Sequence, residues 1–388
     1  MFKIQTLNQI ALKGLDCFSR EKYEISSDHA DPDAILVRSQ KLSIETHESL
    51  KAVARAGAGV NNIPVTEYTQ KGIVVFNTPG ANANAVKELV LTGLLLSSRG
   101  IYQGIQYVQD LDELADKDSL NKEVEAAKKA FKGQELSGKT LGIVGLGAIG
   151  SMVAKMALDL GMRVVGYDPA ISVDAAWRLP STVERMENLL SLVTRSDYVS
   201  LHVPALASTE NLINETILQA FKPNSVLLNF ARDTIVDHQA LQQALETKRV
   251  RTYVTDFPRP EFLHNPSVLA MPHLGASTAE AEENCAVMAA EQLIDFLENG
   301  NIVNSVNFPT LALERTNGYR IALVNLNVPR MLSHVLEILA ERNLNVIDML
   351  NKSRDQIAYN LIDVDTAPTP DLLRTIRGVQ GVINVRQI

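Results

Sequence analysis

Cysteine is scarce in this chain of 388 residues, which has only two. Cys17 and Cys285 have no second Cys or His at the spacing of a metal or redox motif. A disulfide scaffold, a zinc site and a thioredoxin-like motif are therefore disfavoured. We expect both cysteines to be packing residues and predict no metal site.

Positive charge and long apolar runs are scarce as well. The chain has 37 Lys and Arg against 45 Asp and Glu, a formal net charge of -8, so it has no general attraction for nucleic acid or an anionic membrane. The apolar stretches 89–96 and 141–154 are too short or too glycine-rich to span a bilayer, and residues 1–17 lack the apolar core of a signal peptide. We expect a cytoplasmic protein without nucleic-acid or membrane partners, in which local charges bind any anionic ligand.

The length predicts two or three domains. From Thr140 onward, β-rich runs alternate with amphipathic segments, which is typical of a doubly wound α/β domain with a parallel sheet. We place this domain at residues 98–276. Its expected strands are 140–144, 163–167, 197–203, 225–229, 250–255 and 268–270.

A second, less regular α/β unit is expected before this domain, and we give it residues 1–97 and 277–310. A helix over 277–298, ended by Asn299-Gly300, should return the chain to this unit, which is therefore discontinuous. Residues 103–132 are charged and helix-prone, as in a surface arm. The other elements expected are strands at 34–38, 52–55 and 73–76 and an apolar helix over 84–98.

A third domain is predicted at residues 317–388, after a polar break at 309–318. Its patterns read strand, helix, strand, strand, helix, strand, the order of a ferredoxin-like fold. The elements expected are 319–326, 330–342, 345–352, 357–363, 369–377 and 382–387.

Gly145-Leu146-Gly147-Ala148-Ile149-Gly150 is a G-x-G-x-x-G motif between an expected strand and an expected helix over 149–160. In this context the glycines permit a tight turn, and the helix N-terminus can bind a pyrophosphate. Asp168 ends the next strand, where a carboxylate accepts from ribose hydroxyls and repels a 2′-phosphate. We therefore predict that the cofactor is NAD and not NADP.

Two of the seven histidines follow expected strands. We expect His202-Val203-Pro204 to line the cofactor cleft. His273 lies in a rigid turn that leads into a helix, and a histidine held in this way suits proton transfer near neutral pH.

Four motifs together resemble those of the D-isomer-specific 2-hydroxyacid dehydrogenases, and the resemblance covers residues 1 to about 310. They are residues 144–150, Asn229-Phe230-Ala231-Arg232, Asp256 with Glu261, and Pro272-His273-Leu274-Gly275. The resemblance implies a Rossmann-type domain inserted in a flavodoxin-like substrate domain. Residues 54–63, Asn77-Thr78-Pro79 and the HLGAST sequence at 273–278 are most similar to members that act on D-3-phosphoglycerate.

The resemblance also implies roles for individual residues. His273 takes the hydroxyl proton, Glu261 hydrogen-bonds its imidazole, and Arg232 holds the substrate carboxylate. Asp256 receives the nicotinamide carboxamide. The family usually has two apolar residues after that Asp and a Pro after the Glu, whereas this chain reads Phe257-Pro258-Arg259-Pro260 between the two acids. The remaining cofactor contacts expected are Gly145, Gly147, Ala148, Ile149, Gly150, Phe230, Ala231, Arg232, His273, Gly275 and Ala276.

Two further groups are expected to bind the substrate. The N–H groups of Gly57, Ala58, Gly59 and Val60 form a small nest that suits a carboxylate. Arg38-Ser39 and Arg55 end neighbouring strands and would supply the positive field that a phosphorylated acid needs, unless both arginines serve structural ion pairs.

The last segment resembles an ACT domain, which senses amino acids. Asn325, Asn327 and Asn345 are its expected effector contacts, and L-serine is the candidate effector. Members with known serine control have His in place of Asn325 and Gly in place of Arg330, so a purely structural role in assembly is the alternative.

The resemblance implies NAD-dependent oxidation of D-3-phosphoglycerate to 3-phosphohydroxypyruvate, the first step of phosphorylated L-serine synthesis, by a homodimer or homotetramer. One alternative is a reductase of hydroxypyruvate, glyoxylate or another D-2-hydroxy acid. Another is a corepressor-like interaction protein that senses NAD.

Overall fold

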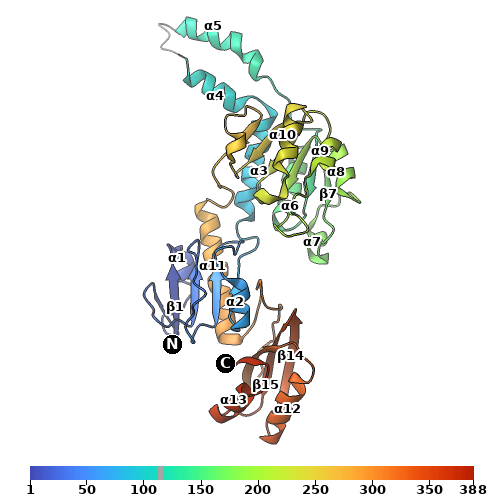
Figure 1. The fold of residues 1–388 in the computed structure, drawn as a ribbon. Coiled ribbons are helices and arrows are strands. Elements are labelled where there is room, and N and C mark those ends of the chain that lie inside the picture. Colours follow the sequence, from blue (N-terminus) through green and yellow to red (C-terminus); the bar gives the residue numbers. More distant parts are fainter. Residues whose placement is uncertain (112–116) are drawn as a thin grey trace. The chain divides into compact units, whose positions relative to one another are not determined.

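The computed structural model describes residues 1–111 and 117–388 and forms two compact units. Met1–Asn82 and Thr278–Ile388 make up the first unit, and Ala83–Ser277 make up the second (Figure 1). The first unit is therefore discontinuous in sequence. In the described residues, no helix is long and apolar enough to cross a membrane.

The second unit contains a sheet of seven strands, all parallel, in the order β12-β11-β10-β9-β6-β7-β8. This is the doubly wound Rossmann order, with the change of direction between β6 and β9. All the strands expected here are present, although the third is shorter than predicted. Their bounds are β6 Thr140–Val144, β7 Arg163–Tyr167, β8 Glu184–Arg185, β9 Tyr198–Leu201, β10 Ser225–Asn229, β11 Val250–Thr255 and β12 Val268–Ala270.

Helices cover both faces of this sheet. The buried residues of α8 (Leu189–Arg195), α9 (Glu215–Ala220) and α10 (His238–Glu246) form one core, and those of α3 (Ala83–Ser98) and α6 (Ala148–Asp159) form another. The predicted domain boundary differs from this division, because it placed α3 in the first unit. Val90 and Leu94 of α3 are fully buried in the core of the second unit.

The expected surface arm corresponds to α4 (Ile101–Gln109), α5 (Lys117–Ala127) and the 3-10 helix Lys128–Phe131. None of the three has a buried residue among those described, so their side chains add little to the core. Part of the predicted helical stretch, residues 112–116, lies outside the described residues. A further short helix, α7 (Val173–Arg178), carries the single tryptophan, Trp177.

The first unit contains a parallel sheet in the order β2-β1-β3-β4-β5, which is the flavodoxin-like order. Helix α11 (Ala279–Asn299) packs on it through alanines and Leu293, and ends at Gly300 with φ +76°, as the Asn-Gly signal predicted. Strands β1 and β2 and helices α1 and α2 were not predicted. The bounds are β1 Phe2–Leu7, α1 Leu12–Leu15, β2 Tyr23–Ser26, β3 Ala34–Val37, β4 Ala52–Arg55, α2 Val65–Gln70 and β5 Val74–Phe76.

The C-terminal part of the first unit is an antiparallel sheet in the order β14-β15-β13-β16, with two helices. The predicted βαββαβ succession is confirmed. One face of the sheet packs on α12 and α13, and Val324, Tyr359 and Leu361 belong to the same core as the parallel sheet and α11. Residues 317–388 therefore group with the first unit. The bounds are β13 Tyr319–Leu326, α12 Met331–Glu341, β14 Val346–Arg354, β15 Ile357–Val364, α13 Pro370–Arg377 and β16 Val382–Gln387.

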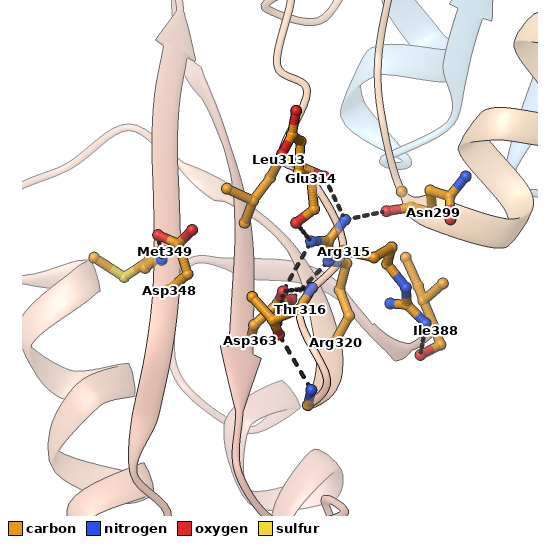
Figure 2. A network of polar contacts seen from close by, with 12 residues as sticks. Asn299, Leu313, Glu314, Arg315, Thr316, Arg320, Asp348, Met349, Asp363 and Ile388 are labelled. Carbon is orange, nitrogen blue, oxygen red and sulfur yellow. Dashed lines mark hydrogen bonds and ion pairs between the residues drawn. The ribbon is translucent and has the colours of Figure 1, made fainter.

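A buried ion pair joins β13 and β15. Arg320 is 0% exposed and Asp363 is 1% exposed, and Arg320 Nε lies 2.6 Å from Asp363 Oδ1 (Figure 2). The other guanidinium N–H groups donate to Asp363 Oδ2 and to the backbone carbonyls of Asn299, Leu313 and Glu314. Burial alone would raise the pKa of Asp363, but the hydrogen bonds from Arg320 lower it below its usual value. The pair thus connects the C-terminal sheet to the end of α11 and to the segment that follows it.

We predict that Asp363→Ala lowers the free energy of unfolding of the first unit by about 3–5 kcal/mol, because Arg320 keeps a buried charge without its counterion. As a control, Arg342→Ala breaks an exposed ion pair with Asp371 and should cost about 1 kcal/mol or less. Urea unfolding followed by far-UV circular dichroism measures both variants. Equal losses in the two variants would contradict the prediction.

Candidate active site

The predicted residues of the second unit lie at one edge of its sheet. Since the strands are parallel, their carboxyl ends share an edge, and doubly wound proteins bind ligands there. Gly145 follows β6, Asp168 follows β7 and His202 follows β9. Arg232, Asp256 and His273 come shortly after β10, β11 and β12.

The glycine motif forms the turn from β6 into α6. Gly145 has φ +92°, and a Cβ there would lie 2.6 Å from the carbonyl oxygen of His202. A Cβ at Gly150 would lie 1.9 Å from the carbonyl oxygen of Gly145, whereas a Cβ at Gly147 would meet nothing within 4 Å. Gly147 is also the N-cap of α6 and offers no side-chain cap. The open position and the uncapped helix N-terminus fit a diphosphate.

Asp168 is held against this turn. Its Oδ2 accepts from the Leu146 N–H at 2.8 Å and its Oδ1 accepts from the Ala170 N–H at 2.9 Å. Each oxygen keeps a further lone pair for a ribose hydroxyl. On the neighbouring strand, His202 Nε2 lies 2.9 Å from Ser200 Oγ, and the His202 N–H donates to the carbonyl of Val144. Val203 and Pro204 continue from there, as expected for the wall of a cofactor site.

Asp256 is fully buried, but only one of its two carboxylate oxygens has a hydrogen-bond partner among the described residues. Its Oδ2 accepts from the Gly275 N–H at 2.9 Å, while its Oδ1 is buried and has no partner among the described residues. Burial raises the pKa of this carboxyl group above its usual value. An unpaired buried acceptor is costly, so a donor from a ligand is expected, and a nicotinamide carboxamide supplies one. The second unit therefore fits NAD.

Asn229 shapes the turn that carries Arg232, a role that the sequence did not suggest. It is fully buried, its Nδ2 donates to the Arg232 carbonyl at 2.9 Å, and its Oδ1 accepts from the Ala231 N–H at 3.1 Å. The Arg232 guanidinium itself donates to the Ala231 carbonyl at 2.6 Å. An Asn at the end of the apolar strand Ser225–Asn229 is the signal that points to such a turn.

The structure does not bring Glu261 and His273 into contact. Glu261 Oε1 lies 3.2 Å from Arg259 Nη1, and Arg259 Nε lies 3.6 Å from Asp233 Oδ2. No hydrogen bond between Glu261 and His273 exists among the described residues. The short helix Pro260–Phe262 buries Phe262, which leaves Glu261 exposed. His273, also exposed, packs against Phe257 with 4.9 Å between ring centroids.

The proposed substrate residues of the first unit do come together. Arg38 follows β3 and Arg55 ends β4, and Arg55 Nε donates to the Arg38 carbonyl at 2.9 Å. The Arg55 Nη1 also donates to the Gly59 carbonyl at 2.5 Å. In the described part of the chain, the N–H groups of Ala58, Gly59 and Val60 donate to no group of the protein. This part of the turn can therefore bind an anion as a nest.

Asn8, which we did not predict, organises the turn at Ser39. Its Oδ1 accepts from the N–H groups of Ser39 and Gln40 at 2.9 and 2.7 Å. Asn8 has φ +70°, a left-handed conformation that asparagine tolerates better than most residues.

The three expected effector residues of the C-terminal sheet differ in accessibility. Asn325 is buried, and its side chain bonds to the Leu326 carbonyl and to Asn360. Asn327 is exposed, with its Nδ2 3.3 Å from the Asp355 carbonyl. Asn345 bonds to Asp365 through its backbone. Asn345 is exposed as well, so Asn327 and Asn345 are the members of this set that a ligand can reach.

Comparison with known proteins supports the assignment of the second unit. Residues 98–275 match the model of the D-isomer specific 2-hydroxyacid dehydrogenase, NAD binding domain. The D-3-phosphoglycerate dehydrogenase of Haemophilus influenzae is 34% identical over 359 residues, which are 88% of this chain and 82% of that protein. This chain belongs to the D-isomer-specific 2-hydroxyacid dehydrogenase family. Its second unit is the NAD-binding domain of that family.

Further relatives include another D-3-phosphoglycerate dehydrogenase and a hydroxypyruvate reductase. The D-3-phosphoglycerate dehydrogenase of Methanocaldococcus jannaschii is 33% identical over 85% of this chain, which spans only 61% of that protein. The hydroxypyruvate reductase of Thermotoga maritima is 35% identical over 71% of this chain and 91% of its own length. The NAD+-bound 3-phosphoglycerate dehydrogenase of Entamoeba histolytica has a similar structure, with a TM-score of 0.63 at 26% identity, over 80% of this chain and 99% of that one.

His202 should make the stability of this family member sensitive to acid. Burial lowers its pKa from the usual 6.5 to about 4, so the unfolded chain binds a proton between these values and the folded chain does not. Stability is therefore lost as the pH falls through 6.5. The free energy of unfolding should fall between pH 7.5 and pH 5, and we predict that this fall is about 2 kcal/mol smaller in His202→Gln.

Urea unfolding followed by far-UV circular dichroism measures this effect at the two pH values. His264→Asn is the control, because His264 is exposed and has φ +64°, which Asn tolerates. An unchanged pH dependence in His202→Gln would refute the assignment.

Proposed function

We propose that this protein oxidises D-3-phosphoglycerate to 3-phosphohydroxypyruvate with NAD, the first step of phosphorylated L-serine synthesis. The observation that carries the choice of substrate is the pair Arg38 and Arg55 beside the unused N–H groups of Ala58, Gly59 and Val60. Two guanidinium groups suit a phosphate, and the nest suits a carboxylate. The family relationship supports the reaction class.

The proposed chemistry divides between a hydride and a proton. When bound, NAD+ supplies the acceptor for the hydride that leaves C2 of the substrate. His273 takes the proton of the C2 hydroxyl, so that a carbonyl forms at C2. Arg232 would release its bond to the Ala231 carbonyl and hold the substrate carboxylate. The Asn229 side chain keeps the backbone of Arg232 in place for this purpose.

We assign Glu261 as the partner of His273 in the substrate complex. Catalytic hydrogen bonds are often long or absent without substrate and form when it binds. The assignment requires Glu261 to exchange its contact with Arg259 for one with the imidazole. An anionic partner would then stabilise the imidazolium that forms during the reaction.

The C-terminal sheet is proposed to be an ACT-type regulatory domain with L-serine as its effector. Support comes from its βαββαβ order and from the exposed side chain of Asn327. We also propose a homodimer or homotetramer, on the family likeness.

Hydroxypyruvate or glyoxylate reduction is a second candidate, and one contact favours it. Glu282 forms an ion pair with Arg38 and so reduces the positive charge available to a phosphate. The relative named hydroxypyruvate reductase supports the same reading. Both candidates use the same residues of the second unit and differ only in the anion that the first unit binds.

A panel of D-2-hydroxy acids tests the proposed substrate. We predict that D-3-phosphoglycerate supports NADH formation with a kcat/KM at least about tenfold higher than D-glycerate or D-lactate. The panel is run with and without added L-serine, which should lower the rate. Equal or better turnover of the unphosphorylated acids would favour the reductase. NAD-dependent capture of a protein partner without any turnover would favour the interaction protein.

His273→Gln tests the proposed base. Loss of a general base should lower kcat by roughly 10²–10⁴-fold, while the glutamine still fills the position. Fluorescence titration should show NADH binding within about threefold of the unsubstituted protein, since Asp256 and Asp168 remain. His264→Asn is the exposed control and should keep full turnover. Turnover retained in His273→Gln would rule out the role.

A further inference from the structure

We infer that Glu282 sets how strongly this protein discriminates between phosphorylated and unphosphorylated 2-hydroxy acids. The inference rests on the proposed function, because it concerns the anion that the first unit binds. Neither the sequence patterns nor the family motifs quoted above assign a role to Glu282. Its position beside the arginine pair is a property of the folded first unit.

Glu282 lies in the first turn of α11 and reaches the end of β3. Its Oε1 lies 2.5 Å from Arg38 Nη2, and each of the two side chains is 40% exposed. A charge-assisted contact of this length occupies one edge of the guanidinium. The exposed fractions show that solvent, and hence a ligand, reaches the pair.

Arg55 also lies next to Arg38, and its guanidinium donates to the backbone carbonyls of Arg38 and Gly59. Arg38 differs from it, because the Glu282 side chain can rotate away. A neutral residue in place of Glu282 would therefore raise the local charge beside Arg38 by one unit. Cys285, one turn further along α11, is buried and adds no charge at neutral pH because burial raises the pKa of its thiol.

The carboxylate acts differently on the two classes of acid. A phosphate bound at Arg38 carries up to two negative charges and lies within a few ångströms of the Glu282 carboxylate. The phosphate must therefore displace this carboxylate or bind against its repulsion. A neutral hydroxymethyl group at the same place meets no such repulsion. Glu282 therefore weakens binding of the phosphorylated acid and leaves binding of the unphosphorylated acid nearly unchanged.

Glu282→Gln tests the inference, with Glu283→Gln as a matched control. Glu283 is the next residue of α11, and its replacement removes the same charge, but its ion-pair partner is Lys13. We expect Glu282→Gln to raise the ratio of kcat/KM for D-3-phosphoglycerate over D-glycerate by about tenfold, mainly through KM, and Glu283→Gln to change it less than twofold. An unchanged ratio, or an equal change in both variants, would overturn the inference.

Binding measured by calorimetry separates this inference from the proposed function. The dissociation constants of D-3-phosphoglycerate and D-glycerate are measured for the three proteins at low and high salt. Glu282→Gln should lower the dissociation constant of D-3-phosphoglycerate by a smaller factor at high salt than at low salt, because salt screens the repulsion. If no acid is oxidised, the proposed function fails, and the binding ratio still decides the inference. If the phosphorylated acid binds all three proteins equally, or binds none, the inference is overturned.

Discussion

Parallel strand direction is the constraint on which the functional residues depend. A strand of a parallel sheet ends at the same edge as its neighbours, so residues far apart in the chain meet there. In the second unit this brings Gly145, Asp168, Asp256 and His273 to one edge. The flavodoxin-like order of the first unit does the same for Arg38 and Arg55. Helical layers on both faces hold these edges in place.

Two buried carboxylates, Asp363 and Asp256, differ in whether groups of the protein itself supply all their hydrogen-bond donors. Asp363 is matched by Arg320, whose N–H groups all find acceptors, and it ties the C-terminal sheet to the rest of its unit. Asp256 is equally buried, yet one of its oxygens has no partner among the described residues. The first arrangement is complete within the protein. The second is complete only with a donor from outside, which is why it points to a ligand.

Much of the fold follows from local pattern. The β-rich runs after Thr140 and the βαββαβ order of the last segment were predicted because buried strands produce short apolar runs between turn signals. Strand β1 was missed because the apolar and polar residues of Phe2–Leu7 alternate over only four positions. Helix α3 was expected, but its apolar residues could not indicate which of two cores they would join.

The sequence by itself determined which residue types stand at each strand end, including the glycine turn, Asp168 and His273, because these depend on short-range spacing. Tertiary structure decided which partners the polar side chains of the two units contact. Glu261 forms an ion pair with Arg259, Glu282 forms an ion pair with Arg38, and the Gly275 N–H donates to one oxygen of Asp256. Arg38 and Glu282 lie 244 positions apart and Asp256 and Gly275 lie 19 apart, so only folding brings them together. Arg259 and Glu261 are near neighbours in the chain, and the folded loop decides that Glu261 contacts Arg259 and not His273.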